Sequence, residues 1–379
     1  MYLTRPPMGF NTWNTFADKI SDQLVREIAD RMVSDGYLDC GYEYLVIDDC
    51  WSKLARDEEG RLVCDPEKFP YGMKDLADYV HSKGLKFGIY SCVGNYTCAG
   101  FPGSFEYEFI DAKTFAEWGI DYLKLDYCYK PMTEDGAKLY RRMGIALANC
   151  GRDIVLSACS WGADETHKWI KSTGAQLFRS TGDIFDNFGS IKEIYNIQKN
   201  IYQYNGQGCF NDMDMLVVGM NGEGHVANRD NFCTLEEYRT HFSIWAMFGS
   251  PLMIGSDIRS QTDATKAILQ NKAVIAIDQD PAYRQPYLFM SKPGDADVWV
   301  RHMDNGDIVF GFFNMSENTE MFPISFADHL GLNRTCGVSL KMFDVWEMKS
   351  LGTFKDIFVT HVEPHSSKLI RARVCEDEK

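Results

Sequence analysis

The stretch Tyr44-Leu-Val-Ile-Asp-Asp-Cys-Trp51 contains the plan on which most of the chain is built. Its apolar run is short enough for a buried strand, and two adjacent carboxylates, Asp48 and Asp49, follow that run directly. A single aspartate after a strand commonly caps the next helix, but two in a row leave at least one carboxylate that needs another partner. The stretch therefore predicts a buried strand whose end carries carboxylates with a functional role.

The same plan of strand, polar loop and amphipathic helix recurs along the first three quarters of the chain. The strand-like runs are residues 8–13, 44–47, 86–90, 122–125, 154–158, 176–179, 209–211 and 251–254. Residues 21–35 and 263–277 show the spacing of apolar residues that is typical of helices. A doubly wound sheet would carry a glycine-rich phosphate turn after its first strand, and this turn is missing. The pattern predicts an α/β fold, a (β/α)₈ TIM barrel over residues 1–285.

After Asp280 and Pro281 the pattern changes to short alternating runs separated by turn residues. Residues 298–301, 308–313, 339–344 and 357–362 are typical of strands and have no helical period. We therefore expect residues 286–379 to form a C-terminal antiparallel β-sandwich domain.

The composition limits the classes of partner. The 379 residues are 45% hydrophobic, which is too apolar for a disordered chain. The 39 basic and 54 acidic residues give a net charge of −15, which argues against a nucleic-acid partner. No stretch has the roughly 18 apolar residues of a membrane span, so we expect no membrane contact. Residues 1–9 lack the features of a secretory signal, which favours a cytoplasmic location, or secretion if a signal has been removed. A homo-oligomer is left open.

Cysteines and histidines give little sign of a metal site. The twelve cysteines include no CxxC pair and are typical of small buried apolar residues, with one or two disulfides left open. His361 and His365 have the spacing of a zinc pair, but Pro364 between them prevents the helix that would present both rings to one ion. We predict no metal and no cofactor.

The ends of the predicted strands carry carboxylates, aromatic rings and two basic residues. With Ser160, they are Trp13, Asp48, Asp49, Tyr90, Lys124, Asp126, Trp161, Arg179, Asp183, Asp212, Asp214 and Asp257. The reacting groups of a barrel enzyme lie at this edge of the sheet. Carboxylates bind vicinal hydroxyls, aromatic rings cover the apolar face of a pyranose, and two carboxylates can act as acid and nucleophile. The strand ends therefore predict a sugar site.

Lys124 and Asp126 are separated by one strand residue, so both side chains point to the same side of the strand. An adjacent ammonium would lower the pKa of Asp126 and keep it ionised, as a nucleophile requires. A structural ion pair inside the barrel explains the two residues equally well. Asp257, by contrast, is expected to cap a helix.

Several longer stretches resemble the α-galactosidases and α-N-acetylgalactosaminidases of glycoside hydrolase family 27. They include Pro7-Met-Gly-Phe-Asn-Thr-Trp13 and Tyr122-Leu-Lys-Leu-Asp-Tyr-Cys128, with residues 44–51, 88–104, 211–216 and 276–281. The resemblance implies a (β/α)₈ barrel followed by an antiparallel β domain, and hydrolysis with retention of the α configuration. This fold agrees with the organisation predicted from the strand pattern.

The resemblance also implies a role for each matched residue. Asp126 corresponds to the nucleophile that forms a glycosyl-enzyme, and Asp183 to the acid/base residue. The implied substrate contacts are Asp48 and Asp49 on the O4 and O6 side, Lys124 on O3 and O4, Trp13 and Tyr90 as walls, Arg179 and Asp214 near C2, and Met215 as a further contact. Cys98 and Cys128 match a family disulfide beside the pocket.

Substrate choice depends on the stretch Cys159-Ser-Trp-Gly-Ala163. Ser160 and Ala163 match the N-acetylgalactosaminidases, whereas α-galactosidases of the family carry a glutamate and a bulkier residue there. A serine leaves room for an acetamido group, and an alanine can contact its methyl group. We therefore expect a retaining exo-glycosidase that removes terminal α-linked N-acetylgalactosamine from glycans. The alternative is an α-galactosidase acting on terminal α-linked galactose. A non-catalytic sugar-binding protein would be expected to lack a catalytic carboxylate, and both are present.

Overall fold

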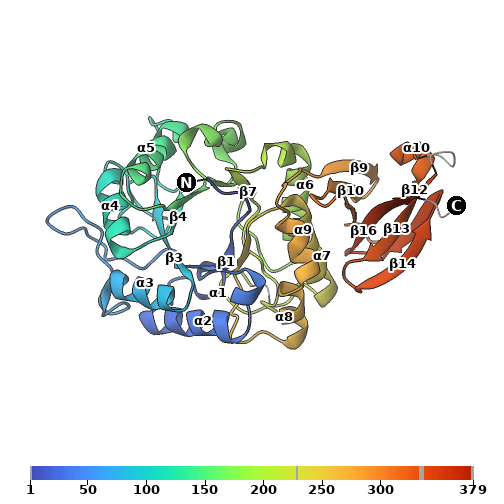
Figure 1. The fold of residues 1–379 in the computed structure, drawn as a ribbon. Coiled ribbons are helices and arrows are strands. Elements are labelled where there is room, and N and C mark those ends of the chain that lie inside the picture. The colour runs from blue at the N-terminus through green and yellow to red at the C-terminus, as the bar shows by residue number, and fades with distance from the viewer. Residues whose placement is uncertain (1, 228, 333–336, 377–379) are drawn as a thin grey trace.

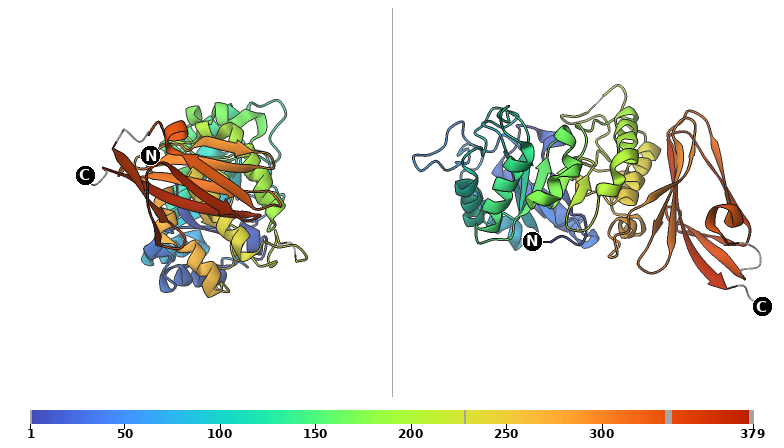
Figure 2. Two further views of the ribbon diagram at one scale, coloured as in Figure 1. Left: turned by 90° about the vertical axis from the view of Figure 1, so that its right-hand side faces the viewer. Right: turned by 90° about the horizontal axis from the view of Figure 1, so that it is seen from above.

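The computed structural model describes residues 2–227, 229–332 and 337–376. A barrel of parallel strands occupies one end of the molecule and an antiparallel β-module the other (Figures 1 and 2). Helix α9 ends at Asp278 and strand β9 begins at Tyr287, so the architecture changes between these residues. No helix in the described part of the chain is long and apolar enough to cross a bilayer.

The barrel strands lie on the predicted runs. They are β1 (Met8–Asn11), β2 (Tyr44–Val46), β3 (Lys86–Cys92), β4 (Tyr122–Asp126), β5 (Val155–Cys159), β6 (Leu177–Arg179), β7 (Phe210–Asp212) and β8 (Leu252–Ile254). Neighbouring strands pair in the order β7-β6-β5-β4-β3-β2-β1-β8, and every pair is parallel. A parallel bridge from Leu216, just after β7, to Ile254 in β8 joins the two ends. The predicted barrel architecture is confirmed.

Strand β4 shows how the barrel positions its polar groups. Leu123 and Leu125 are buried on the outer side of the strand, which the surrounding helices cover. Tyr122 points to the opposite side and belongs to the apolar cluster that fills the barrel. Lys124 and Asp126 share the side of Tyr122, because side chains alternate along a strand. The polar residues therefore follow one another up the inside of the barrel to its mouth.

The described residues form ten α-helices. They are α1 (Trp13–Phe16), α2 (Asp22–Ser34), α3 (Gly72–Ser82), α4 (Glu108–Trp118), α5 (Gly136–Ala148), α6 (Phe188–Ile201), α7 (Leu235–Phe248), α8 (Asp263–Leu269), α9 (Lys272–Asp278) and α10 (Phe326–Leu330). Ser21 caps α2 by accepting a hydrogen bond from the Leu24 N–H, and Thr234 with Glu237 forms a capping box at the start of α7. These caps fix where the helices begin.

The single helix that the sequence predicts over residues 263–277 is two helices in the structure, α8 and α9. The side chain of Asn271 accepts hydrogen bonds from the N–H groups of Ala273 and Val274 and so starts a new helix. The spacing of the apolar residues continues across the break, so the sequence pattern by itself predicted one helix.

The β-module contains two sheets. Its strands are β9 (Tyr287–Lys292), β10 (Ala296–His302), β11 (Ile308–Asn314), β12 (Glu320–Ser325), β13 (Val338–Asp344), β14 (Lys349–Phe354), β15 (Ile357–Val362) and β16 (Ser366–Glu376). Six strands pair in the order β14-β13-β16-β11-β10-β9, and β12 pairs with β15. Phe312 and Ile370 of the larger sheet pack with Phe322 and Phe358 of the smaller one. The antiparallel sandwich is confirmed, with the short helix α10 as an addition that the strand pattern did not predict.

The barrel and the β-module share a buried polar interface. Helix α7 lies between them (Figure 1) and contacts β11 and β16. Tyr195 on α6 donates a hydrogen bond of 2.6 Å to the buried Asp297 carboxylate, which Lys199 also contacts at 2.6 Å. Trp299 donates to the Tyr195 hydroxyl at 2.9 Å. A buried, bonded network of this kind is costly to separate, so we expect the two parts to move together.

Candidate active site

Side chains from the successive strand ends β1 to β7 enclose a cavity of about 260 Å³ at the mouth of the barrel. Its lining consists of Trp13, Asn14, Asp48, Asp49, Tyr90, Cys98, Lys124, Asp126, Cys128, Trp161, Arg179, Asp183, Asp214 and Met215. Twelve of these are residues that the sequence predicts for the site. The cavity is slightly smaller than the roughly 300 to 1,000 Å³ of pockets for drug-sized ligands, which suits one sugar ring.

One wall of the cavity carries a charged pair from β2 and β4. Lys124 Nζ lies 2.8 Å from Asp48 Oδ2, which also accepts a hydrogen bond of 2.8 Å from Asn11 Nδ2. The adjacent Asp49 accepts from the Ala99 N–H at 3.0 Å and so holds the loop after β3 against the site. Ammonium and carboxylates together offer donors and acceptors to sugar hydroxyls.

Asp126 lies buried at the end of β4. The Tyr90 hydroxyl donates to its Oδ2 at 3.1 Å, and the Tyr127 N–H donates to its Oδ1 at 2.7 Å. Burial raises the pKa of Asp126 to about 6, and the nearby Lys124 opposes this rise only in part. Lys124 does lower the pKa of Asp126, as the sequence predicts, but the net pKa lies above its usual value. Desolvation outweighs the ammonium, whose direct partner is Asp48.

Arg179 at the end of β6 joins two carboxylates from different loops. Its Nη2 lies 2.8 Å from Asp183 Oδ1, and its Nη1 lies 2.8 Å from Asp214 Oδ1. Arg179 and Asp214 are buried, whereas 60% of the Asp183 side chain is exposed. Burial raises the pKa of Asp183, but Arg179, Lys124 and His225 lower it by more, so the pKa lies below its usual range. Asp183 thus lies at the open side of the cavity, and its cationic neighbours favour the ionised form.

The loop after β5 differs from the sequence-based prediction. Ser160 is fully buried with its Oγ 2.6 Å from Thr166 Oγ1, and Ala163 packs against the barrel core. Neither residue lines the cavity; Trp161 does. Trp161 adopts a φ of 58°, and a side chain at the following Gly162 would lie 2.4 Å from the Ser180 carbonyl oxygen. This tight turn moves the serine away from the cavity and brings the indole into its lining.

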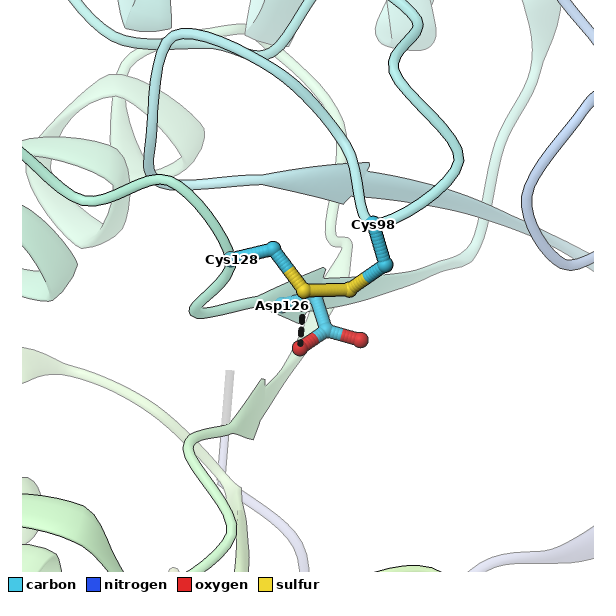
Figure 3. A group of neighbouring side chains, drawn as sticks. All are labelled: Cys98, Asp126 and Cys128. Carbon is cyan, nitrogen blue, oxygen red and sulfur yellow. Dashed lines mark hydrogen bonds between the residues drawn. A yellow bond between two sulfur atoms is a disulfide. The ribbon is translucent and has the colours of Figure 1, made fainter.

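A disulfide joins Cys98 and Cys128 beside Asp126, as Figure 3 shows. Cys128 Sγ lies 3.9 Å from Asp126 Oδ1, and the Tyr90 hydroxyl lies 3.4 Å from Cys98 Sγ. The two sulfurs and the carboxylate are close enough to suggest a metal site, but sulfurs bonded to each other are not the thiolates that bind metals. The disulfide instead closes one wall of the cavity.

Asn14 is a cavity residue that the sequence did not predict, because it directly follows Trp13 and position along the chain gave no reason to prefer it. Trp161 is among the strand-end residues predicted at the barrel mouth, but the sequence assigned it no role in the site. Asp257 does not cap a helix as expected, because α8 begins at Asp263 and Thr262 is its cap. The Asp257 carboxylate instead accepts from the Arg259 N–H at 3.0 Å and binds the Arg259 side chain at 2.8 and 3.0 Å. It does not line the cavity.

Comparison with known proteins agrees with this geometry. The model of the family "Alpha galactosidase A" matches residues 5–280, and that of the "Alpha galactosidase C-terminal beta sandwich domain" matches residues 293–372. An α-galactosidase of Cyamopsis tetragonoloba is 41% identical over 365 residues, which cover 96% of this chain and 85% of that relative.

Solved structures give the same result over both parts of the chain. α-Galactosidase I from Mortierella vinacea has a TM-score of 0.91 and 34% identity, with 100% of this chain and 99% of that chain covered. The α-galactosidase of Saccharomyces cerevisiae with raffinose has a TM-score of 0.87 and 28% identity, with 98% of each chain covered. The chain therefore belongs to the melibiase-like family of glycoside hydrolases, family 27, and is a glycoside hydrolase.

Proposed function

We propose that the protein is a retaining exo-α-galactosidase that releases terminal α-linked galactose. The observation that carries the proposal is the pair Asp126 and Asp183, one buried and one exposed, on a cavity of the size of one sugar ring. A cavity of this size accepts the terminal sugar of a chain, which is what exo-action requires. The names of the relatives support galactose as that sugar.

The proposed reaction has two displacements at C1 of the sugar. Asp126 attacks C1 and forms a glycosyl ester while Asp183 donates a proton to the leaving oxygen. Asp183 then accepts a proton from a water molecule, which attacks C1 and frees Asp126. Each displacement inverts C1, so the product keeps the α configuration. The hydrogen bonds from Tyr90 and the Tyr127 N–H hold the Asp126 carboxylate in one orientation.

The C2 side of the cavity favours galactose over N-acetylgalactosamine. The family resemblance assigns Arg179 to this side, and the Gly162 N–H next to Trp161 donates to the Arg179 carbonyl at 3.2 Å. Trp161 lines the cavity, and we infer that its indole narrows the space for an acetamido group on this side. Our sequence-based preference for N-acetylgalactosamine depended on Ser160 and Ala163, and neither lines the cavity.

We expect an aryl α-galactoside to be hydrolysed with a kcat/KM at least about tenfold above that of the matching N-acetylgalactosaminide, because the extra group must fit against the indole. Trp161→Ala should open this space and reduce the ratio of the two kcat/KM values by about tenfold. Initial rates with the two aryl glycosides measure both effects.

Ser160→Ala is the matched control, because Ser160 is fully buried and bonded to Thr166. It should leave the ratio of the kcat/KM values for the two aryl glycosides unchanged. A wild-type enzyme that prefers the N-acetylgalactosaminide would contradict the proposed sugar and restore the prediction made from Ser160 and Ala163.

The pH dependence should differ between two substrates, because only one of them needs a proton on its leaving group. For α-galactosyl fluoride, kcat/KM requires only ionised Asp126 and should fall below about pH 6, where this carboxylate is protonated. For a galactoside, the reactive form has ionised Asp126 and protonated Asp183 together. The pKa of Asp183 is the lower of the two, so this form is most abundant between the two pKa values. Its kcat/KM should therefore fall above about pH 6.

Rates with both substrates over about pH 4 to 8, with circular dichroism to follow folding, check this difference. Two profiles with the same pH dependence would show that the assigned protonation states are wrong, even if the enzyme acts on both substrates.

A further inference from the structure

Asp214 contacts both the partner and the backbone of Asp183. Its Oδ1 lies 2.8 Å from Arg179 Nη1, and Nη2 of the same guanidinium lies 2.8 Å from Asp183 Oδ1. Its Oδ2 accepts a hydrogen bond of 2.7 Å from the N–H of Ile184, which directly follows Asp183 in the chain. The position of the Asp214 carboxylate therefore determines where the proposed acid/base residue lies.

The backbone of Asp214 has an unusual conformation. Its φ is 79°, in the left-handed region that a residue with a side chain adopts only at a cost in energy. A backbone of this kind persists only where the surrounding contacts hold it. The direction of the Asp214 side chain therefore depends on what holds the turn at this residue.

Two buried rings of helix α7 hold the turn. The Trp245 indole N–H donates to the Asp214 carbonyl at 2.7 Å. One helical turn earlier, the neighbouring His241 accepts at Nε2 from the Val217 N–H at 3.2 Å. Burial lowers the pKa of His241 to about 3, so its ring is neutral and able to accept. The two rings pack edge-to-face with 4.0 Å between their centres. Neither ring lines the cavity, so α7 acts on the site through the backbone of residues 214–217.

We propose that Trp245 is a positioning residue for general acid catalysis: its hydrogen bond holds the turn at Asp214, and Asp214 orients the Asp183 carboxyl toward the leaving oxygen. The inference rests on the proposed α-galactosidase activity, in which Asp183 is the acid. Without the indole N–H, a buried carbonyl loses its partner and the strained backbone loses a contact that holds it. A shift of about 1 Å in a reacting group can lower a rate by up to about a hundredfold.

The test compares a substrate whose leaving group needs a proton with one whose leaving group does not. Trp245→Phe removes the N–H and keeps an aromatic ring. We expect the ratio of kcat/KM for a disaccharide of galactose α-1,6-linked to glucose to kcat/KM for α-galactosyl fluoride to fall by about tenfold. Cleavage of the fluoride requires the sugar site and Asp126 but no acid.

Trp346→Phe is the matched control. The Trp346 indole donates to Ser243 Oγ on the same helix at 2.8 Å, so this variant also removes an indole N–H that binds α7. Ser243 has no contact with the cavity lining through this bond, and the ratio of the two kcat/KM values should stay at its wild-type value.

The outcomes separate the positioning role from a structural one and from the activity itself. Equal losses on both substrates in Trp245→Phe, or an unchanged ratio, would overturn the positioning role and leave the α-galactosidase activity standing. A wild-type protein that cleaves neither substrate would refute the activity. If Trp245→Phe lacks the circular dichroism spectrum of the wild type, benzothienylalanine in place of Trp245 gives the same test, because it has the shape of tryptophan and no N–H.

Discussion

Asp126→Asn should lower kcat/KM for an aryl α-galactoside by at least about 10⁴-fold, because the variant cannot form the glycosyl ester through which both displacements proceed. The loss should be equally large for α-galactosyl fluoride, since its first displacement needs the same nucleophile. The fold should persist, because asparagine has the shape of aspartate and its oxygen can still accept from the Tyr127 N–H.

A matched control for this variant is Asp257→Asn. Asp257 also follows a barrel strand, but its carboxylate binds Arg259 and lies outside the cavity lining. We expect it to keep wild-type activity within about twofold. A slow-turnover fluorinated galactosyl donor should add one sugar to the wild-type peptide that contains Asp126, as peptide mass spectrometry can show. A sugar found on another residue would remove Asp126 from the role of nucleophile.

Asp183→Ala should lower kcat/KM for a disaccharide of galactose α-1,6-linked to glucose by roughly 10² to 10⁴-fold, which is the usual contribution of a general acid. The effect on α-galactosyl fluoride should be much smaller, because fluoride leaves without protonation. Removing an exposed carboxylate leaves Arg179 paired with Asp214 at 2.8 Å, so no buried charge loses its last partner.

Azide provides the positive test of this role. A small anion can attack the glycosyl ester from the space that the missing carboxylate leaves, so azide should raise the turnover of Asp183→Ala and give α-galactosyl azide. Glu165→Ala, which removes an exposed carboxylate paired with Lys168, is the control and should not respond to azide. An Asp183→Ala variant with equal losses on both substrates and no azide effect would mean that Asp183 has another function.

The strand pattern predicted the barrel because a buried parallel strand has a local signature. Each apolar run lies between turn and helix signals, and all eight runs became strands within a few residues of their predicted bounds. The same locality explains why most of the site was predicted. Strand ends meet at one edge of a parallel barrel, so residues such as Asp48, Asp126 and Asp214 come together wherever they lie in the sequence. The break between α8 and α9 was not predicted. Asn271 caps a new helix there, while the spacing of the apolar residues continues across the break.

The sequence by itself thus determined the fold class, the two-part organisation and the set of groups around the cavity. The tertiary structure decided the pKa values of those groups and which side chains point into the cavity. The pKa of Asp126 is raised to about 6 because packing removes water from its carboxylate, and Lys124 is engaged by Asp48 from another strand. Trp161 lines the cavity in place of Ser160 because the backbone turns sharply where Gly162 meets the Ser180 carbonyl. Burial, pairing across strands and the path of a loop after a strand depend on contacts between distant segments, which a local pattern does not contain.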